Sequence, residues 1–117
     1  MKFSKSLKLN HVFRRLYAKG NSAANRYLVL YCRRNGSNEN RVGITVSKKL
    51  GCAVVRNRAR RRLRECYRIH EAQLRPGYDV VIVARTRCVD APFSRLEEAF
   101  LSAAGSVGLL REPEEKA

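Results

Sequence analysis

The residues best suited to chemistry in this chain are arginines, and many of them stand close together. Between Lys48 and Arg68 there are nine cationic residues and one acidic residue, Glu65. The guanidinium group is a planar fork that matches phosphate oxygens and stacks on bases. A surface that serves only solubility mixes both signs of charge. The run therefore predicts a site that binds a polyanion.

A helix is expected to carry this run, because residues 56–74 contain no Gly or Pro and are rich in helix formers. Like charges three or four residues apart each cost about 0.2 to 0.5 kcal/mol, and six such pairs together cost roughly 1 to 3 kcal/mol. Arg58 and Arg62 fall on one flank with Glu65. The adjoining face carries Asn57, Arg60, Arg61, Arg64 and Arg68. A penalty of this size favours a nucleic-acid partner over a merely solvated face.

The remaining face of the same helix is apolar and is expected to pack on a sheet. At 100° per residue the stripe consists of Ala59, Leu63, Cys66, Tyr67, His70 and Leu74. Core packing is the favoured role for Cys66 and His70, since no third group that could orient them for chemistry is visible.

The elements around this helix follow the order α β β α β α. A first helix capped by Ser6 or Asn10 ends at Gly20, and apolar strands are expected at 26–33, 41–47 and 79–85. The turn cluster at 35–40 suggests a hairpin between the first two strands. A basic loop at 48–55 precedes the long helix, and a last helix is expected at 92–110. The pattern predicts an α+β fold, a two-layer sandwich of helices on a small mixed sheet with a βαβ crossover.

Composition limits the class of protein. The 117 residues carry 25 Lys and Arg against 10 Asp and Glu, a formal charge of +15, and 18 of the cations are Arg. One domain over residues 1–117 is expected, which the charge predicts to bind nucleic acid, with a flexible tail at 111–117. Apolar runs are too short for a membrane span, and no signal peptide is visible. The four cysteines form no CxxC pair, which favours reduced, buried thiols in the cytoplasm.

The segment at 41–65 resembles the signature of the bacterial ribonuclease P protein subunit. It reads RVGITVSKKLGCAVVRNRARRRLRE, in which SKK, a glycine, AV, RNR, RR and RE stand in the order of that family. The similarity extends to Phe13, Tyr17, Tyr31, the Asn25-Arg26 pair and the strand at 79–85, and covers about residues 7–110. Cys52 departs from it, where the family commonly has Asn, and so does Val12, where an acidic residue is common.

The resemblance implies a fold with one more short strand and a left-handed βαβ crossover, where general rules favour a right-handed one. It implies no catalytic residues in the protein, since a partner RNA cleaves precursor tRNA with Mg²⁺ and the protein itself binds no cofactor. The implied partners are ribonuclease P RNA and precursor tRNA, with neither DNA nor a membrane. The expected RNA contacts are Lys48, Lys49, Arg56, Asn57, Arg58, Arg60, Arg61, Arg64 and Arg68.

Aromatic residues are expected to bind the single-stranded 5′ leader of the precursor. The resemblance assigns Phe13, Tyr17 and Tyr31 to a cleft for this strand. Aromatic rings beside a cationic groove stack on bases without demanding a sequence. Helical spacing alone favours core packing for Phe13 and Tyr17. The resemblance favours leader binding instead, and it does so more strongly for Tyr17 and Tyr31 than for Phe13.

Three other functions compete with this one. A ribosome-associated RNA-binding protein or RNA chaperone would share the charge and size but would not need this order of motifs. A protein-only nuclease would need a carboxylate cluster or paired histidines, whereas Asp79, Asp90, His11 and His70 are isolated in the sequence. A DNA-binding helix-turn-helix needs a short turn between two helices, which the expected elements do not supply.

Overall fold

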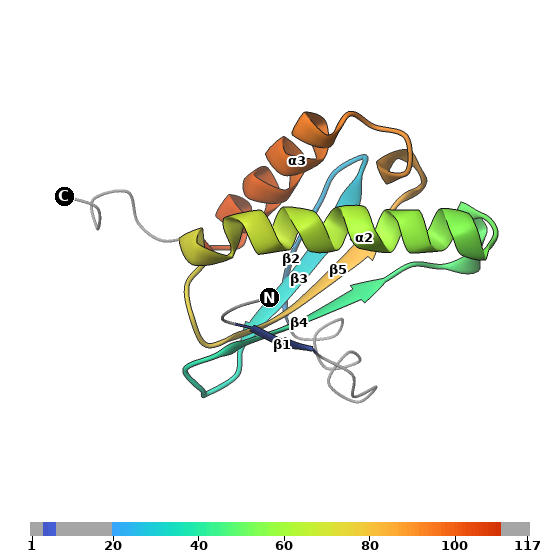
Figure 1. Cartoon of the computed structure of the whole chain (residues 1–117). Coiled ribbons are helices and arrows are strands. Elements are labelled where there is room, and N and C mark those ends of the chain that lie inside the picture. The colour runs from blue at the N-terminus through green and yellow to red at the C-terminus, as the bar shows by residue number, and fades with distance from the viewer. Residues whose placement is uncertain (1–3, 7–19, 111–117) are drawn as a thin grey trace.

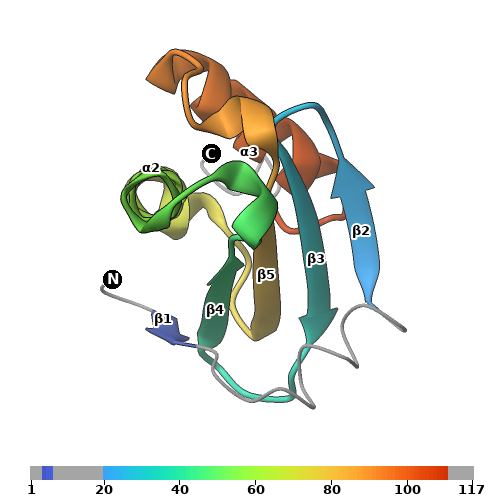
Figure 2. The same cartoon turned by 90° about the vertical axis from the view of Figure 1, so that its right-hand side faces the viewer.

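A five-stranded sheet carries the two described α-helices on one face (Figures 1 and 2). The structure is a computed structural model that describes residues 4–6 and 20–110. Its strands are β1 (Ser4–Ser6), β2 (Asn21–Ala24), β3 (Leu28–Arg34), β4 (Asn40–Thr45) and β5 (Tyr78–Ala84). Its helices are α2 (Ala53–His70) and α3 (Phe93–Ser106), with 3₁₀ turns η1 (Lys48–Leu50), η2 (Glu71–Gln73) and η3 (Thr86–Cys88).

The predicted βαβ crossover joins β4 to β5 through α2. These two strands are parallel neighbours, with Val42 opposite Val80 and Ile44 opposite Ile82. In Figure 1 the helix lies across the β4 and β5 half of the sheet, and α3 covers the β3 and β2 half. The predicted α+β sandwich on a mixed sheet is therefore confirmed, and the left-handed crossover stays a prediction.

The predicted hairpin between the first two expected strands, at 26–33 and 41–47, is wrong, because the corresponding strands β3 and β4 are not neighbours in the sheet. The strand order is β1-β4-β5-β3-β2, so β5 lies between β3 and β4, and β3 instead forms its hairpin with β2. The physical reason is burial, because β5 is the most continuously apolar strand and is most stable at the centre. Residues 35–39 cross the start of β5, where the amide of Asn35 donates to the carbonyl of Gly77.

The apolar stripe of α2 packs on the sheet as expected. Ala59, Leu63, Cys66 and Tyr67 are buried, and the ring of Tyr67 meets the edge of Phe100 from α3. His70 stacks on Phe100 and places Nε2 3.1 Å from Oε2 of Glu97. Both Cys66 and His70 therefore contribute to packing between the helices.

Element boundaries differ from the prediction mainly at the helices. The long helix begins at Ala53, three residues earlier than expected, and ends at His70, four residues earlier than expected. Strand β2 is the additional short strand that the resemblance implied, whereas β1 was not predicted. The expected first helix and the tail at 111–117 lie outside the described residues.

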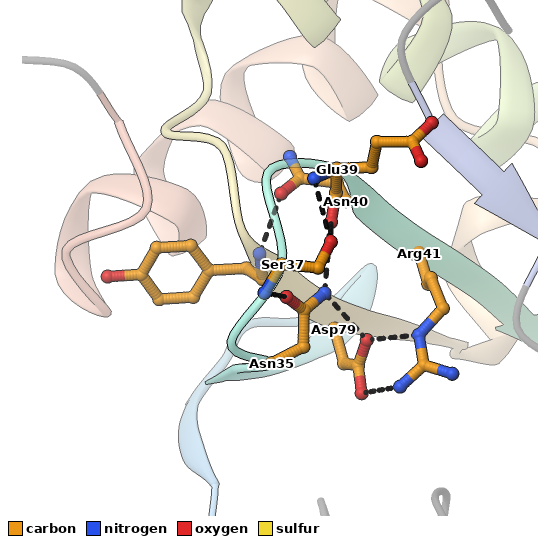
Figure 3. Close-up of polar contacts among 7 residues, drawn as sticks. Asn35, Ser37, Glu39, Asn40, Arg41 and Asp79 are labelled. Atoms are coloured by element: carbon orange, nitrogen blue, oxygen red, sulfur yellow. Dashed lines mark hydrogen bonds and ion pairs between the residues drawn. The ribbon is translucent and has the colours of Figure 1, made fainter.

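A polar network fixes the crossing between β3 and β4 at the start of β5 (Figure 3). Asp79 accepts two hydrogen bonds from Arg41, from Nε and from Nη2, both at 2.7 Å. Asn35 donates from Nδ2 to Oδ1 of Asp79 and to the carbonyl of Glu39. One nearly buried carboxylate, whose side chain is 10% exposed, thus joins β5 to β4 and to the residue that follows β3.

We expect Asp79→Ala to lower the free energy of unfolding by about 1 to 3 kcal/mol, because charge-assisted hydrogen bonds are lost and Asn35 loses an acceptor. Urea unfolding followed by circular dichroism measures the change. Asp90→Ala, at an exposed position, is the matched control and should stay within about 0.5 kcal/mol of the parent. Equal stability of the two variants would show that the network contributes little.

Candidate nucleic-acid interface

One exposed face of α2 gathers four of the predicted RNA contacts around a hollow. We call the residues that line it the α2 surface: Val54, Asn57, Arg60, Arg61 and Arg64. Nη1 of Arg60 donates to Oδ1 of Asn57 at 2.9 Å, so the amide orients one guanidinium group. No hydrogen bond or ion pair of Arg61 or Arg64 occurs within the described part of the chain. These arginines are available to phosphate.

Val54 is a member of this surface that the sequence reasoning missed. Its side chain is 75% exposed, which is unusual for a large apolar residue. The signal was present, because residues 54, 57, 61 and 64 share one face at helical spacing. The hollow is therefore lined by an exposed apolar side chain as well as by cationic ones.

The start of α2 adds to the positive potential. No acidic residue stands in the first turn, where the amides of Val54 and Val55 face the exposed thiol of Cys52 rather than a carboxylate. The positive end of the helix dipole therefore faces outward. Lys48 and Lys49 are exposed on η1 just before it. The turn between η1 and α2 needs Gly51, whose φ of 139° is unfavourable for other residues.

Cys52 is exposed at this helix start, so the prediction that all four cysteines are buried is wrong for it. It occupies the position just before the first residue of the helix. The amides of Val55 and Val54 stabilise its thiolate and lower its pKa. Burial has the opposite effect elsewhere, and raises the pKa of Cys32 to about 11 and that of Cys66 to about 12.

Arg68 and Arg56 are predicted RNA contacts that are less available to phosphate than Arg61 and Arg64. Arg68 forms two hydrogen bonds with Glu65, at 2.9 and 2.5 Å, which compete with phosphate binding. Glu65 was expected on the opposite flank, but the two side chains reach each other across one turn. Arg56 is half-buried, and its Nε has no hydrogen-bond partner in the described structure.

The other flank of α2 is occupied by Arg58 and Arg62, which contact the loop before α3. Both donate to the carbonyl of Val89, Arg58 from Nε at 3.2 Å and Arg62 from Nη1 at 3.0 Å. Arg62 also donates to the carbonyl of Ala91. These bonds hold α2 against the loop and so set the direction of the α2 surface. Arg58, a predicted RNA contact, therefore has a structural contact as well.

Tyr31 lies on the other face of the sheet. In β3 it stands opposite Val81 of β5, and side chains alternate between faces along a strand. Its neighbours Leu30 and Cys32 belong to the core under the helices. Tyr31 is therefore separated from the α2 surface by the sheet. Phe13 and Tyr17, the other predicted leader contacts, lie outside the described residues.

Within the described ranges, 4–6 and 20–110, no group of three His, Cys, Asp or Glu residues is arranged to hold a metal ion. In the same ranges no helix is long and apolar enough to cross a membrane.

Comparisons with known proteins agree on one family. The family model described as Ribonuclease P matches residues 1–107. The chain is 46% identical over 101 residues to the ribonuclease P protein component of Alkaliphilus oremlandii, covering 86% of this chain and 89% of that protein. It is 45% identical over 97 residues to the protein of that name from Clostridioides difficile, covering 82% and 85%.

Solved structures give the same result for the fold. The RNase P protein of Staphylococcus aureus matches with a TM-score of 0.80 and 33% identity, over 91% of this chain and 97% of that one. The RNase P protein of Thermotoga maritima matches with a TM-score of 0.75 and 30% identity, over 84% and 93%. These matches favour the ribonuclease P interpretation over a ribosomal protein or an RNA chaperone. The chain belongs to the ribonuclease P protein family, whose members are protein components of a ribonucleoprotein endoribonuclease.

Proposed function

We propose that this chain binds ribonuclease P RNA through the α2 surface and helps that RNA to remove the 5′ leader of precursor tRNA in the cytoplasm. The observation that carries the proposal is the hollow of α2, where Asn57, Arg60, Arg61 and Arg64 converge. Three arginines at one hollow favour binding to phosphates. The match to the RNR motif of the family favours ribonuclease P RNA as the partner that carries them.

The chemistry is proposed to belong to the RNA. The protein contributes positive charge that offsets phosphate repulsion between the catalytic RNA and its substrate. Mg²⁺ is expected to act in the assembled particle, with no metal or other cofactor held by the protein itself.

The leader is proposed to bind at Tyr31, on the face of the sheet opposite α2 and α3, and to contact Phe13 and Tyr17 as the family resemblance implies. A single strand exposes its bases for stacking, and stacking is tolerant of sequence. Separate faces for the two RNAs would let the protein contact the catalytic RNA and the leader at the same time.

Cys52 offers a direct test of RNA binding at the α2 surface, because it is exposed at the first turn of that helix. Its lowered pKa favours the reactive thiolate, whereas a pKa of about 11 against the ordinary 9.0 reduces the thiolate of Cys32 about 100-fold. We expect iodoacetamide at neutral pH to label Cys52 alone in the native protein. Addition of ribonuclease P RNA should then slow this labelling.

Peptide mass spectrometry after timed labelling measures the rate at each cysteine. Cys52→Ala should abolish native labelling, and denatured protein should label at all four positions. An unchanged rate at Cys52 under conditions where the RNA is fully bound would place the RNA on another surface.

A further inference from the structure

A second group of arginines lies at the end of the molecule where β5 ends and α3 begins. Arg26 stands in the turn between β2 and β3, Arg85 follows β5, Arg87 is in η3, and Arg95 is in the first turn of α3. All four are exposed. We call these four residues the turn surface.

Asn25 fixes the turn that carries Arg26. Its Oδ1 accepts hydrogen bonds from the amides of Tyr27 and Leu28, at 3.0 and 3.1 Å. Its Nδ2 donates to the carbonyl of Ala99 in α3 at 3.1 Å. Its own carbonyl accepts a hydrogen bond from Nη1 of Arg85 at 3.1 Å. The turn is therefore tied both to α3 and to the end of β5.

This arrangement places Arg26 and Arg95 around one shallow hollow. The hollow is lined by Asn25, Arg26, Tyr27, Arg95, Glu98, Ala99 and Ser102. Tyr27 is partly buried and packs against the core, so this part of the lining is held in place by the core. The backbone that carries Arg26 is therefore fixed by the hydrogen bonds of Asn25, and the two exposed guanidinium groups lie at the same hollow.

The charge of this hollow is not balanced by strong ion pairs. Arg95 approaches Glu98 only at 3.9 Å, and both side chains are mostly exposed, so water weakens the attraction. Arg26 and Arg87 form no ion pair with any residue that the structure describes. The first turn of α3 contains no acidic residue, so the positive end of its dipole adds to the field.

Arg95 of the turn surface belongs to α3, which covers the same face of the sheet as α2, and the turn with Arg26 is tied to α3 through Asn25. The loop that connects them is held by Arg58 and Arg62 of α2, through the carbonyl of Val89. Tyr31, in contrast, lies on the opposite face of the sheet. A large folded RNA seated on α2 can reach the turn surface, whereas a leader bound at Tyr31 would have to pass around the sheet.

We infer that the turn surface is a second binding site for phosphates of ribonuclease P RNA. The inference rests on the proposed function and extends it to a surface outside the RNR motif. Two separate contacts on one rigid protein make the second binding event intramolecular, which raises overall affinity beyond that of either contact.

The test compares two triple variants of equal charge. The turn variant carries Arg26→Ala, Arg87→Ala and Arg95→Ala, and leaves Arg85 in place because it binds the carbonyl of Asn25. The α2 variant carries Arg60→Ala, Arg61→Ala and Arg64→Ala. Affinity for a bacterial ribonuclease P RNA and for a single-stranded leader oligonucleotide is measured across a range of salt concentrations, after circular dichroism confirms folding.

We expect the turn variant to lower the slope of log affinity against log salt by about 2 to 3 for ribonuclease P RNA, and to leave leader affinity unchanged. Lysine at the same three positions should restore the slope. If only the α2 variant lowers the slope, the turn surface is not a phosphate site and the proposed function stands. If neither variant lowers it, the proposed function fails too. If the turn variant weakens only the leader complex, the inferred occupant is wrong.

Discussion

Replacing Arg60, Arg61 and Arg64 together with Ala should sharply weaken binding of ribonuclease P RNA, with the slope of log affinity against log salt falling by about 2 to 3. Each phosphate that a cation neutralises releases counterions and contributes about 0.7 to 0.9 to that slope. The three side chains line one hollow, and Arg61 and Arg64 make no competing ion pair with a described residue. Filter binding or fluorescence anisotropy at several salt concentrations measures the slope.

The matched control replaces the same three arginines with Lys, which keeps the charge and removes the planar fork. It should retain most of the slope. Folding should not suffer in the Ala variant, because the substitutions remove like-charge pairs such as Arg60 with Arg64. A parent-like slope in a folded Ala variant would mean that the hollow of α2 is not the RNA site.

Tyr31→Ala should weaken binding of leader-bearing precursor tRNA to the holoenzyme by about 1 to 3 kcal/mol and leave mature tRNA binding nearly unchanged. The reason is that a stacking platform needs unpaired bases, and the 5′ end of mature tRNA is paired in a stem. Tyr31 is partly exposed on the sheet face opposite α2 and α3, which is where we propose that the strand lies. Equilibrium binding of both tRNAs to parent and variant holoenzyme makes the comparison.

Tyr31→Phe keeps the ring and should bind the precursor almost as well as the parent. Equal losses for precursor and mature tRNA in the Ala variant would move Tyr31 from leader recognition to a structural role. The same experiment on Tyr17 extends the test to the segment that the structure does not describe.

The sequence predicted the strongly patterned elements well. The uninterrupted apolar run of β5 predicted a central strand, and the stripe through Leu63 and Tyr67 predicted the buried face of α2. The pairing of the strands was harder to predict, because the turn at 35–40 is compatible either with a hairpin or with a crossing over β5. The choice depends on β5, which lies about 40 residues further along the chain.

In the candidate site, too, the features that depend on local spacing were predicted and the contacts between distant segments were not. Helical spacing placed Asn57, Arg60, Arg61 and Arg64 on one face, and the structure gathers them around one hollow. Spacing could not reveal that Arg62 turns to the carbonyls of Val89 and Ala91, since those atoms belong to a distant loop. Nor could it show the turn surface, which depends on the hydrogen bond from Asn25 to α3. Contacts between distant segments are fixed by packing rather than by local pattern.

The central claim is that the protein assists an RNA that performs the cleavage, and one cleavage assay tests it directly. Precursor tRNA is incubated at low magnesium with the purified protein alone, with a bacterial ribonuclease P RNA alone, and with both. The account predicts little cleavage in the first two reactions and a clear rise in accurate 5′ cleavage in the third. Failure of the protein to raise cleavage, or metal-dependent cleavage by nuclease-free protein that a substitution in one of its own carboxylates abolishes, would contradict it.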